Sequence, residues 1–254
     1  MRINLRRSTV VLYAVVTFGL LCIPTKGLGQ NPAEVLKVMI DPGHGGEDSG
    51  SKGSRGVAEK DLTLALAKKL VQVLETAETI RPELVRTDDT SISLDQRAGM
   101  ANHNQGDLLI SLHLGTTFTP VPTGFSIYYW SPTTASPTAV PSSSTVKPTV
   151  KPWDQEQEPY WEKSRMLASL MQEELLWSIP WASGGVLPAD IYLLRRVRMP
   201  AVMLEIGSLS HPEEAAQLQK AEFQESVAKA LSQAIVKYRS LDEKGLVLPQ
   251  TKSQ

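Results

Sequence analysis

The chain has 254 residues, of which 41% are hydrophobic, and this is enough to bury the core of one domain of ordinary size. Its formal net charge is −1, and removal of the basic first 29 residues leaves 22 basic residues against 27 acidic ones, which argues against nucleic acid as a partner. The single cysteine, Cys22, lies in that first segment, so the remaining chain can form neither disulfides nor a cysteine-bound zinc site.

Residues 1–29 have the features of a secretory signal peptide. Arginines precede an apolar stretch, and small residues follow it at a plausible cleavage site. The apolar stretch is short for a membrane span, although an uncleaved anchor stays an alternative. A lipid-modified cysteine is less favoured because Leu20 and Leu21 precede Cys22. The segment predicts an exported protein of the periplasm or cell envelope, with membrane contact only if the segment is not cleaved. The residues concerned are Arg2, Arg6, Arg7, Val10–Ile23 and Gly27–Gly29.

The following hundred residues predict alternating strands and helices. An apolar strand at Leu36–Asp41 is ended by Pro42 and Gly43, and a loop rich in Gly and Ser extends to residue 58. A helix is predicted from Glu59 to about Thr76, because its leucines recur on one face. The further predicted elements are a short strand at Glu83–Arg86, a helix at Ser93–His103, a buried strand at Asp107–Leu112 and a strand at Gly124–Trp130.

The composition changes after Trp130. Residues 131–152 are mostly Ser, Pro, Thr, Val and Ala, and acidic and aromatic residues follow. Such a segment cannot bury a core, so we predict a flexible insert at about 131–160 that is dispensable for folding. Beyond it we predict a helix to about Trp177, an irregular edge strand at Gly185–Leu194, a buried strand at Ala201–Ile206, a helix at Ala221–Tyr238 and a disordered tail at 241–254.

This alternation predicts an α/β fold with a mostly parallel twisted sheet and helices on both faces. Sheets of this kind place their active sites at the carboxyl ends of the strands. Residues 30–240 would form this one domain, interrupted by the insert.

Ionisable side chains stand where buried strands should be apolar or should end. His44 follows the first strand between glycines, His113 ends the strand at 107–113, and Glu205 interrupts the apolar run 201–206. Such groups are costly to bury unless they are paired or bind a metal. Two histidines and a carboxylate in matching strand contexts therefore suggest one shared polar site, most plausibly a metal site.

Structural alternatives exist for several of these residues. His44 could cap a turn, and His113 could be a hydrogen-bonded core histidine. Glu59 opens a helix, where the helix dipole favours a carboxylate, so by itself it reads as structural. His103 and His211 lie at predicted helix ends and are also interpreted as structural.

Several short segments carry a more specific signal through their order. They are DPGHGG at 41–46, EKD at 59–61, SLDQR at 93–97, AN at 101–102, DLLISLH at 107–113, GF at 124–125 and MPAVMLEIG at 199–207. From about Lys37 to Tyr238, the chain thereby resembles the zinc-dependent N-acetylmuramoyl-L-alanine amidases, which are bacterial cell-wall hydrolases.

The resemblance implies roles for four residues. The zinc ligands of the family match His44, Glu59 and His113, and its catalytic glutamate matches Glu205. Three protein ligands leave a fourth position for water, as catalytic zinc requires. The implied reaction is hydrolysis of the amide bond between N-acetylmuramic acid and L-alanine in peptidoglycan, for cell-wall remodelling or cell separation. Glu205 would take the water proton and give it to the leaving amine. Peptidoglycan is the expected partner, and a protein activator is a further candidate.

The chain departs from the family pattern at Leu114, Gly115, Gly184 and Ser208, which puts substrate contacts and turnover in doubt but not zinc binding. The alternative function is a catalytically weak or inactive peptidoglycan-binding or regulatory protein on the same fold, and a third is a zinc peptidase. The insert occupies a place where some relatives carry a segment that blocks the active site. Its Asp154, Glu156 or Glu158 could offer a carboxylate to zinc, although a solvated linker is favoured.

Overall fold

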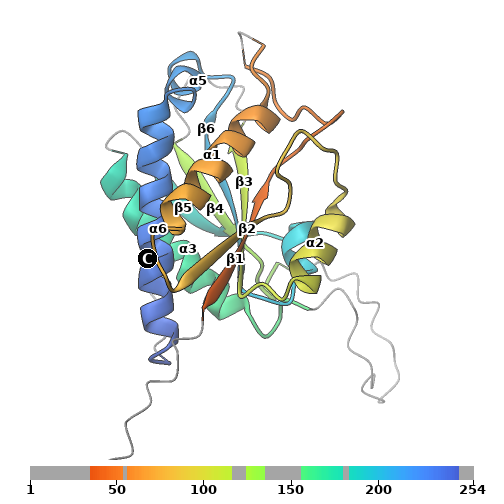
Figure 1. Ribbon diagram of the computed structural model, residues 1–254, viewed down its shortest axis with the longest axis vertical. Coiled ribbons are helices and arrows are strands. Elements are labelled where there is room, and N and C mark those ends of the chain that lie inside the picture. Colours follow the sequence, from red (N-terminus) through yellow and green to blue (C-terminus); the bar gives the residue numbers. More distant parts are fainter. Residues whose placement is uncertain (1–34, 54–55, 116–123, 135–155, 180–182, 246–254) are drawn as a thin grey trace, which may run out of the picture. The chain divides into compact units, whose positions relative to one another are not determined.

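Six strands form one sheet in the order β2-β1-β3-β6-β4-β5 (Figure 1). The computed structural model describes residues 35–53, 56–115, 124–134, 156–179 and 183–245, so the predicted signal peptide lies outside the described residues. The strands are β1 (Leu36–Pro42), β2 (Ile80–Leu84), β3 (Leu108–Gly115), β4 (Phe125–Tyr129), β5 (Gly184–Pro188) and β6 (Ala201–Ser208).

The sheet is mostly parallel, as predicted. Strands β2, β1, β3 and β6 run in one direction, while β4 is antiparallel to β6 and β5 is parallel to β4. Phe125 at the start of β4 is paired with Ile206, and Tyr129 at its end is paired with Val202. The chain therefore leaves β4 at the end of the sheet where β6 begins, and this end is opposite the carboxyl ends of β1, β3 and β6.

Helices cover both faces of the sheet, which confirms the predicted architecture (Figure 1). The larger hydrophobic core joins one face to α1, α3 and α6, and the smaller core joins the other face to α2 and α4. The helices are α1 (Glu59–Leu74), α2 (Leu94–His103), α3 (Trp161–Ser178), α4 (Tyr192–Arg195), α5 (Pro212–Leu218) and α6 (Ala221–Asp242). No helix among the described residues is long and apolar enough to cross a membrane.

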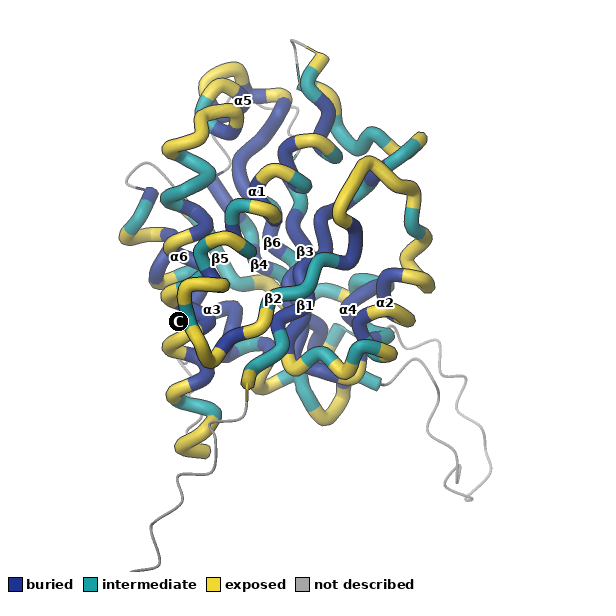
Figure 2. The backbone as a smooth tube through the Cα atoms, viewed as in Figure 1, coloured by how far each residue is buried: buried dark blue, intermediate teal, exposed yellow. Residues whose placement is uncertain are grey.

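Strand β3 shows how the two cores are filled. Leu108, Ile110 and Leu112 enter the larger core, whereas Leu109 enters the smaller one, because successive side chains of a strand point to opposite faces. The inner strands β1, β3, β6 and β4 are buried over most of their length, whereas the edge strands β2 and β5 are more exposed (Figure 2). On the face of Leu109, the next positions along β3 are Ser111 and His113. The apolar cover on that face gives way to polar residues toward the carboxyl end of the strand.

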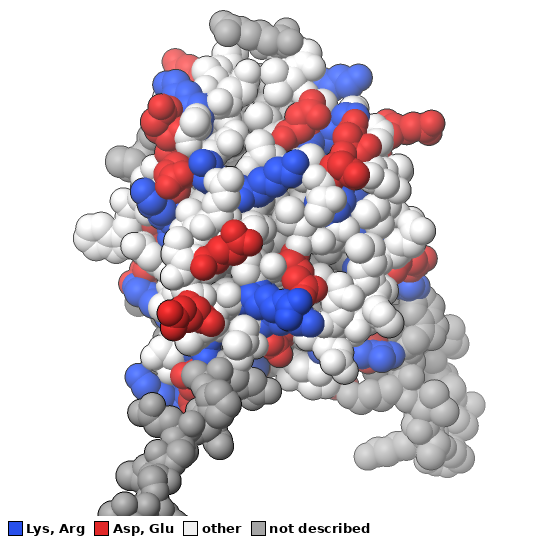
Figure 3. Space-filling view, in the orientation of Figure 1, with Lys and Arg blue, Asp and Glu red and all other residues white. Residues whose placement is uncertain are grey.

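Charged side chains of both signs are interspersed on the face shown in Figure 3. Lys69 of α1 pairs with Glu225 of α6 at 3.2 Å, and Lys237 of α6 pairs with Glu173 of α3 at 3.3 Å. Exposed pairs of this kind contribute little to stability. The apolar side chains between the helices therefore hold this layer together.

Two predicted strands differ from the observed ones. The strand predicted at Glu83–Arg86 lies at Ile80–Leu84, and it contains Pro82. Proline is tolerated there because β2 is an edge strand, so the missing N–H faces no partner strand. The edge strand predicted at Gly185–Leu194 ends at Pro188, and a short helix follows at Tyr192–Arg195.

Parts of the predicted insert and of the predicted tail belong to the described structure. Residues 131–134 and 156–160 belong to the described structure, and only 135–155 of the insert lie outside it. Gln157 is fully buried, and its Nε2 donates to the carbonyl oxygens of Val197 at 3.0 Å and Met199 at 2.5 Å. The last helix continues to Asp242, so only residues 246–254 of the predicted tail lie outside the described part of the chain.

Candidate active site

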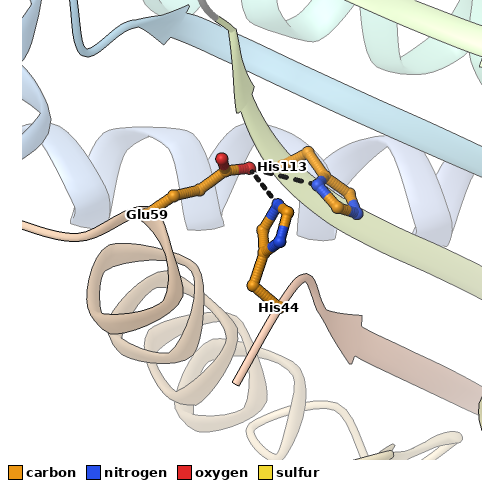
Figure 4. A group of neighbouring side chains, drawn as sticks. All are labelled: His44, Glu59 and His113. Carbon is orange, nitrogen blue, oxygen red and sulfur yellow. Dashed lines mark hydrogen bonds and ion pairs between the residues drawn. The ribbon is translucent and has the colours of Figure 1, made fainter. Parts of the chain in front are cut away.

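The three predicted metal ligands lie together at the carboxyl ends of β1 and β3 (Figure 4). His44 follows β1, Glu59 is the first residue of α1, and His113 lies in β3. One ligand atom from each lies within 4.8 Å of the others. His44 Nε2 and His113 Nδ1 are each 3.1 Å from Glu59 Oε1. Two imidazole nitrogens and one carboxylate at this spacing fit the donor set of a catalytic zinc site.

Glu59 is buried, and both of its carboxylate oxygens accept hydrogen bonds. Oε1 accepts from the backbone amide of Leu114 and Oε2 from that of Ser51, each at 2.9 Å. Burial opposes ionisation, but the hydrogen bonds from the two histidines and the two amides outweigh it and hold the pKa of Glu59 well below its usual range. These contacts hold Glu59 in its ionised form and fix both of its oxygens in place.

His44 is oriented by a residue that the sequence interpretation missed. Its Nδ1 lies 2.8 Å from Oδ2 of Asp48. The hydrogen bond to Glu59 raises the pKa of His44 most strongly, burial lowers it, and the bond to Asp48 raises it further. A proton on Nδ1 shared with Asp48 leaves Nε2 as the nitrogen that faces Glu59, the arrangement in which a carboxylate fixes a metal-binding histidine. Only the position of Asp48 four residues after His44 could have indicated it.

Two buried arginines hold the turn that carries His44. Arg97 donates to the His44 carbonyl oxygen from Nη2 and to Asp41 Oδ1 from Nη1, each at 2.6 Å. The other oxygen of Asp41 accepts from the Ser111 hydroxyl at 2.8 Å. Arg86 donates to the carbonyl oxygens of the preceding turn residues, Pro42 and Gly43, at 2.9 Å. Asp41 and Arg97 stand in the segments that carry the family resemblance, but their contact could not be read from the sequence.

Glycine is required beside the ligands. A Cβ atom on Gly43 would lie 2.4–2.7 Å from the ring of His113, and one on Gly50 would lie 2.6–2.8 Å from the side chains of His44 and Glu59. For Gly43, the group that approaches is the second histidine of the cluster.

Glu205 lies beside the cluster without belonging to it. In the pairing of β3 with β6, Glu205 is the partner of His113, so both side chains point to the same face of the sheet. Burial raises the pKa of Glu205, and the Tyr128 hydroxyl donates to its Oε2 at 3.3 Å. Tyr128 comes from β4, and the sequence interpretation did not single it out. A carboxylate with a raised pKa beside a metal site is suited to proton transfer.

The residues that depart from the family pattern, which include Leu114, Gly184 and Ser208, do not belong to the cluster of His44, Glu59 and His113. The Leu114 side chain is buried in the larger core, on the face opposite His113, while its amide supports Glu59. The ring of Phe125 covers Gly184 so closely that a Cβ there would lie 2.3–2.5 Å from it. Ser208 is buried, and its hydroxyl lies 2.7 Å from that of Ser210.

Other candidate residues lie away from the site. His211 caps α5 by accepting from the Glu214 amide, and His103 is the last residue of α2, so both lie at helix ends as predicted. Glu156 accepts a hydrogen bond from Arg198 at 3.0 Å, beside the start of β6. Glu156 therefore lies near the amino-terminal ends of the central strands, at the opposite end of the sheet from the cluster. The alternative of Glu156 as a zinc ligand is thus wrong. Asp154 lies outside the described residues.

Similarity to known proteins agrees with this site. Residues 38–237 match the family described as N-acetylmuramoyl-L-alanine amidase. The protein YqiI of Bacillus subtilis (strain 168) is 32% identical over 207 residues, which are 82% of this chain and 86% of YqiI. Among solved structures, the N-acetylmuramoyl-L-alanine amidase from Clostridium difficile 630 is 31% identical with a TM-score of 0.65, covering 84% of this chain and all of that one. The CwlD amidase from Clostridioides difficile, solved in complex with the GerS lipoprotein, is 25% identical with a TM-score of 0.66, covering 82% and 100%.

Proposed function

Because the chain belongs to the N-acetylmuramoyl-L-alanine amidase family, we propose that it hydrolyses the amide bond between N-acetylmuramic acid and L-alanine in peptidoglycan, with a zinc ion held by His44, Glu59 and His113 and with Glu205 as the general base. The observation that carries the proposal is the His-Glu-His cluster with Glu205 paired to His113 on the adjacent strand. The donor set supports zinc, because two imidazoles and one carboxylate leave a position for water.

The chemistry that zinc supplies when bound is polarisation of the amide carbonyl and acidification of water. Glu205 accepts the water proton in its ionised form and then donates it to the nitrogen of the leaving amine. The hydrogen bond from Tyr128 orients this carboxylate, which lies on the same face of the sheet as His113. Glu59, fully ionised, offsets cationic charge in the site.

The substrate sets where the protein works. Peptidoglycan lies outside the cytoplasm, so we propose extracytoplasmic action in the periplasm or cell envelope, to which residues 1–29 would direct the chain as a signal peptide. The solved complex of CwlD with the GerS lipoprotein supports a protein as a further partner of this chain, and we propose that such a partner acts as an activator.

Digestion of purified peptidoglycan by the zinc-loaded protein tests the proposal. The expected products are stem peptides with a free L-alanine amine and glycan strands that carry a lactyl carboxylate, identified by mass spectrometry. Glu205→Gln should release both products at least roughly 10²-fold more slowly. Binding to peptidoglycan without release of product would favour the regulatory alternative, and cleavage at another amide bond would favour a zinc peptidase.

A further inference from the structure

We infer that the substrate binds in one orientation along the sheet. Its N-acetylmuramoyl side lies in the cavity beside His44, and its stem peptide lies over β6, β4 and β5. This inference deepens the proposed function and rests on it. It assigns a sugar subsite and a peptide subsite to opposite sides of the ligand cluster.

The sheet order places different surfaces on the two sides of His113. Strand β3 lies between β1 and β6, so His44 flanks His113 on one side and Glu205 flanks it on the other. On the His44 side, a cavity of about 390 Å³ is lined by residues of the β1 turn, by residues 91–94 before and at the start of α2, and by His113 itself. Glu205 does not line this cavity. The cavity therefore begins at the ligand cluster and extends away from the general base.

Proton transfer fixes which half of the substrate lies on which side. Glu205 must come within hydrogen-bond reach, about 3 Å, of the leaving nitrogen to protonate it. That nitrogen belongs to L-alanine, so the stem peptide begins on the Glu205 side. The acyl carbon carries the lactyl group and the sugar as its other substituent, and these extend in the opposite direction, into the cavity.

The cavity has the chemistry of a sugar subsite. Its size is within the range of small-molecule pockets, and it suits a single sugar ring. Ser91 and Asp48 offer groups for hydrogen bonds to hydroxyls and an acetamido group, while Ile92 and Leu94 offer an apolar wall for the C–H face of a ring. Leu94 is 48% exposed although it is a large apolar residue.

On the other side of His113, the described residues leave part of the sheet face exposed, and this face suits an extended peptide. Ser126 of β4 is the pairing partner of Glu205, and Tyr128 follows on the same face. Leu187 of the edge strand β5 is the partner of Tyr128 and therefore points to that face too, where it is 45% exposed. These side chains therefore share one face of the sheet across β6, β4 and β5, from Glu205 to the edge strand.

Calorimetric binding of the two reaction products to the zinc-loaded protein tests this polarity. N-acetylmuramic acid is the probe for the cavity, and the free stem tripeptide is the probe for the sheet face. Leu94→Trp fills the cavity and should weaken the sugar acid by about tenfold or more, with the tripeptide unaffected. Leu187→Trp should weaken the tripeptide and leave the sugar acid unaffected. Met100→Trp is the matched control, because Met100 is an exposed residue of α2 outside this cavity.

The opposite pattern, equal effects of both variants on both products, or no binding of the sugar acid to the wild-type protein would overturn the inference. Thermal midpoints within the range of the control variant show that the substitutions leave the fold intact. Binding is measured without turnover, so the result is separate from the proposed function: loss of amidase activity in the wild-type protein contradicts that function, whereas a reversed binding pattern contradicts only the polarity.

Discussion

Arg97 donates a hydrogen bond of 2.6 Å to the carbonyl oxygen of His44, whose backbone has a φ of 61°. A non-glycine residue in the left-handed region costs about 1–3 kcal/mol and persists only where its surroundings hold it. The contact thus links a buried arginine of α2 to the conformation that directs the His44 ring toward Glu59.

Arg97→Lys should therefore weaken zinc binding by about tenfold or more, in the range measured for residues that orient metal ligands. Lysine keeps the positive charge but cannot bond Asp41 and His44 together in the fork geometry of arginine. Competition with a chelator measures the zinc affinity. Arg81→Lys is the control, since Arg81 is 68% exposed and distant from the cluster in sequence. An unchanged affinity in a folded Arg97 variant would show that the turn holds its conformation without this side chain.

His113→Ala should abolish stoichiometric zinc binding, because two ligands remain where three are needed. Elemental analysis of the purified variant measures the metal content. His103→Ala, which changes a histidine in the last turn of α2, should keep one zinc per chain. Full zinc content in the His113 variant would contradict the assigned ligand set.

Glu205→Gln should keep zinc and the fold but lower the rate of hydrolysis by roughly 10²-fold or more, which is the usual contribution of a general base. The amide has nearly the shape of the carboxylate but cannot accept the water proton. Glu213→Gln on α5 is the matched control. Turnover close to that of the wild type would mean that another group activates the water.

Tyr128→Phe should change the pH dependence of hydrolysis. Glu205 works as a base only when ionised, so kcat/KM falls as the pH falls through its pKa, which burial raises above the usual value of a glutamate. The bond from Tyr128 lowers that pKa, so its removal should move the acidic limb of the profile to higher pH. It should also lower kcat by about tenfold with little change in KM. An unmoved acidic limb would show that Tyr128 does not act on Glu205.

Gln157→Leu should lower the free energy of unfolding by about 1–3 kcal/mol, because the buried carbonyl oxygens of Val197 and Met199 lose their donor. Chemical denaturation measures the loss. Replacement of residues 135–155 alone by a short Gly-Ser linker should leave the thermal midpoint unchanged, since it spares Gln157. Activity after that replacement should be unchanged or modestly higher. A large loss of stability in the linker variant would place a structural element inside 135–155.

The direction of β4 also decides at which end of the sheet the insert lies. Because β4 is antiparallel to β6, residues 131–134 and 156–160 flank the insert where β6 begins, and Glu156 pairs there with Arg198. The sequence analysis favoured a solvated linker and left open, as an alternative, that a carboxylate of the insert reaches zinc. The direction of β4 rules out that alternative for Glu156.

The sequence by itself determined the elements whose apolar pattern is long and regular. Strands β1, β3 and β6 lie close to their predicted ranges because strands buried on both faces require continuous apolar runs, and helices α1, α3 and α6 do so because a buried helix face requires apolar residues with a period of 3.6. It also singled out His44, His113 and Glu205 as candidate site residues, because their ionisable side chains lie within or beside otherwise apolar strands. Glu59 depended on the family resemblance, because a carboxylate at a helix start is common for other reasons.

Only the tertiary structure decided the contacts between residues distant along the chain. The bonds from Arg97 to Asp41 and His44, from Tyr128 to Glu205 and from Gln157 to the start of β6 join segments that are 40 to 77 residues apart. The local sequence around each of these side chains does not predict which residue it contacts. The direction of β4 was likewise undetermined, because apolar alternation is the same for a strand read in either direction, and it is the pairing with β6 that places Tyr128 beside the base and the insert away from it.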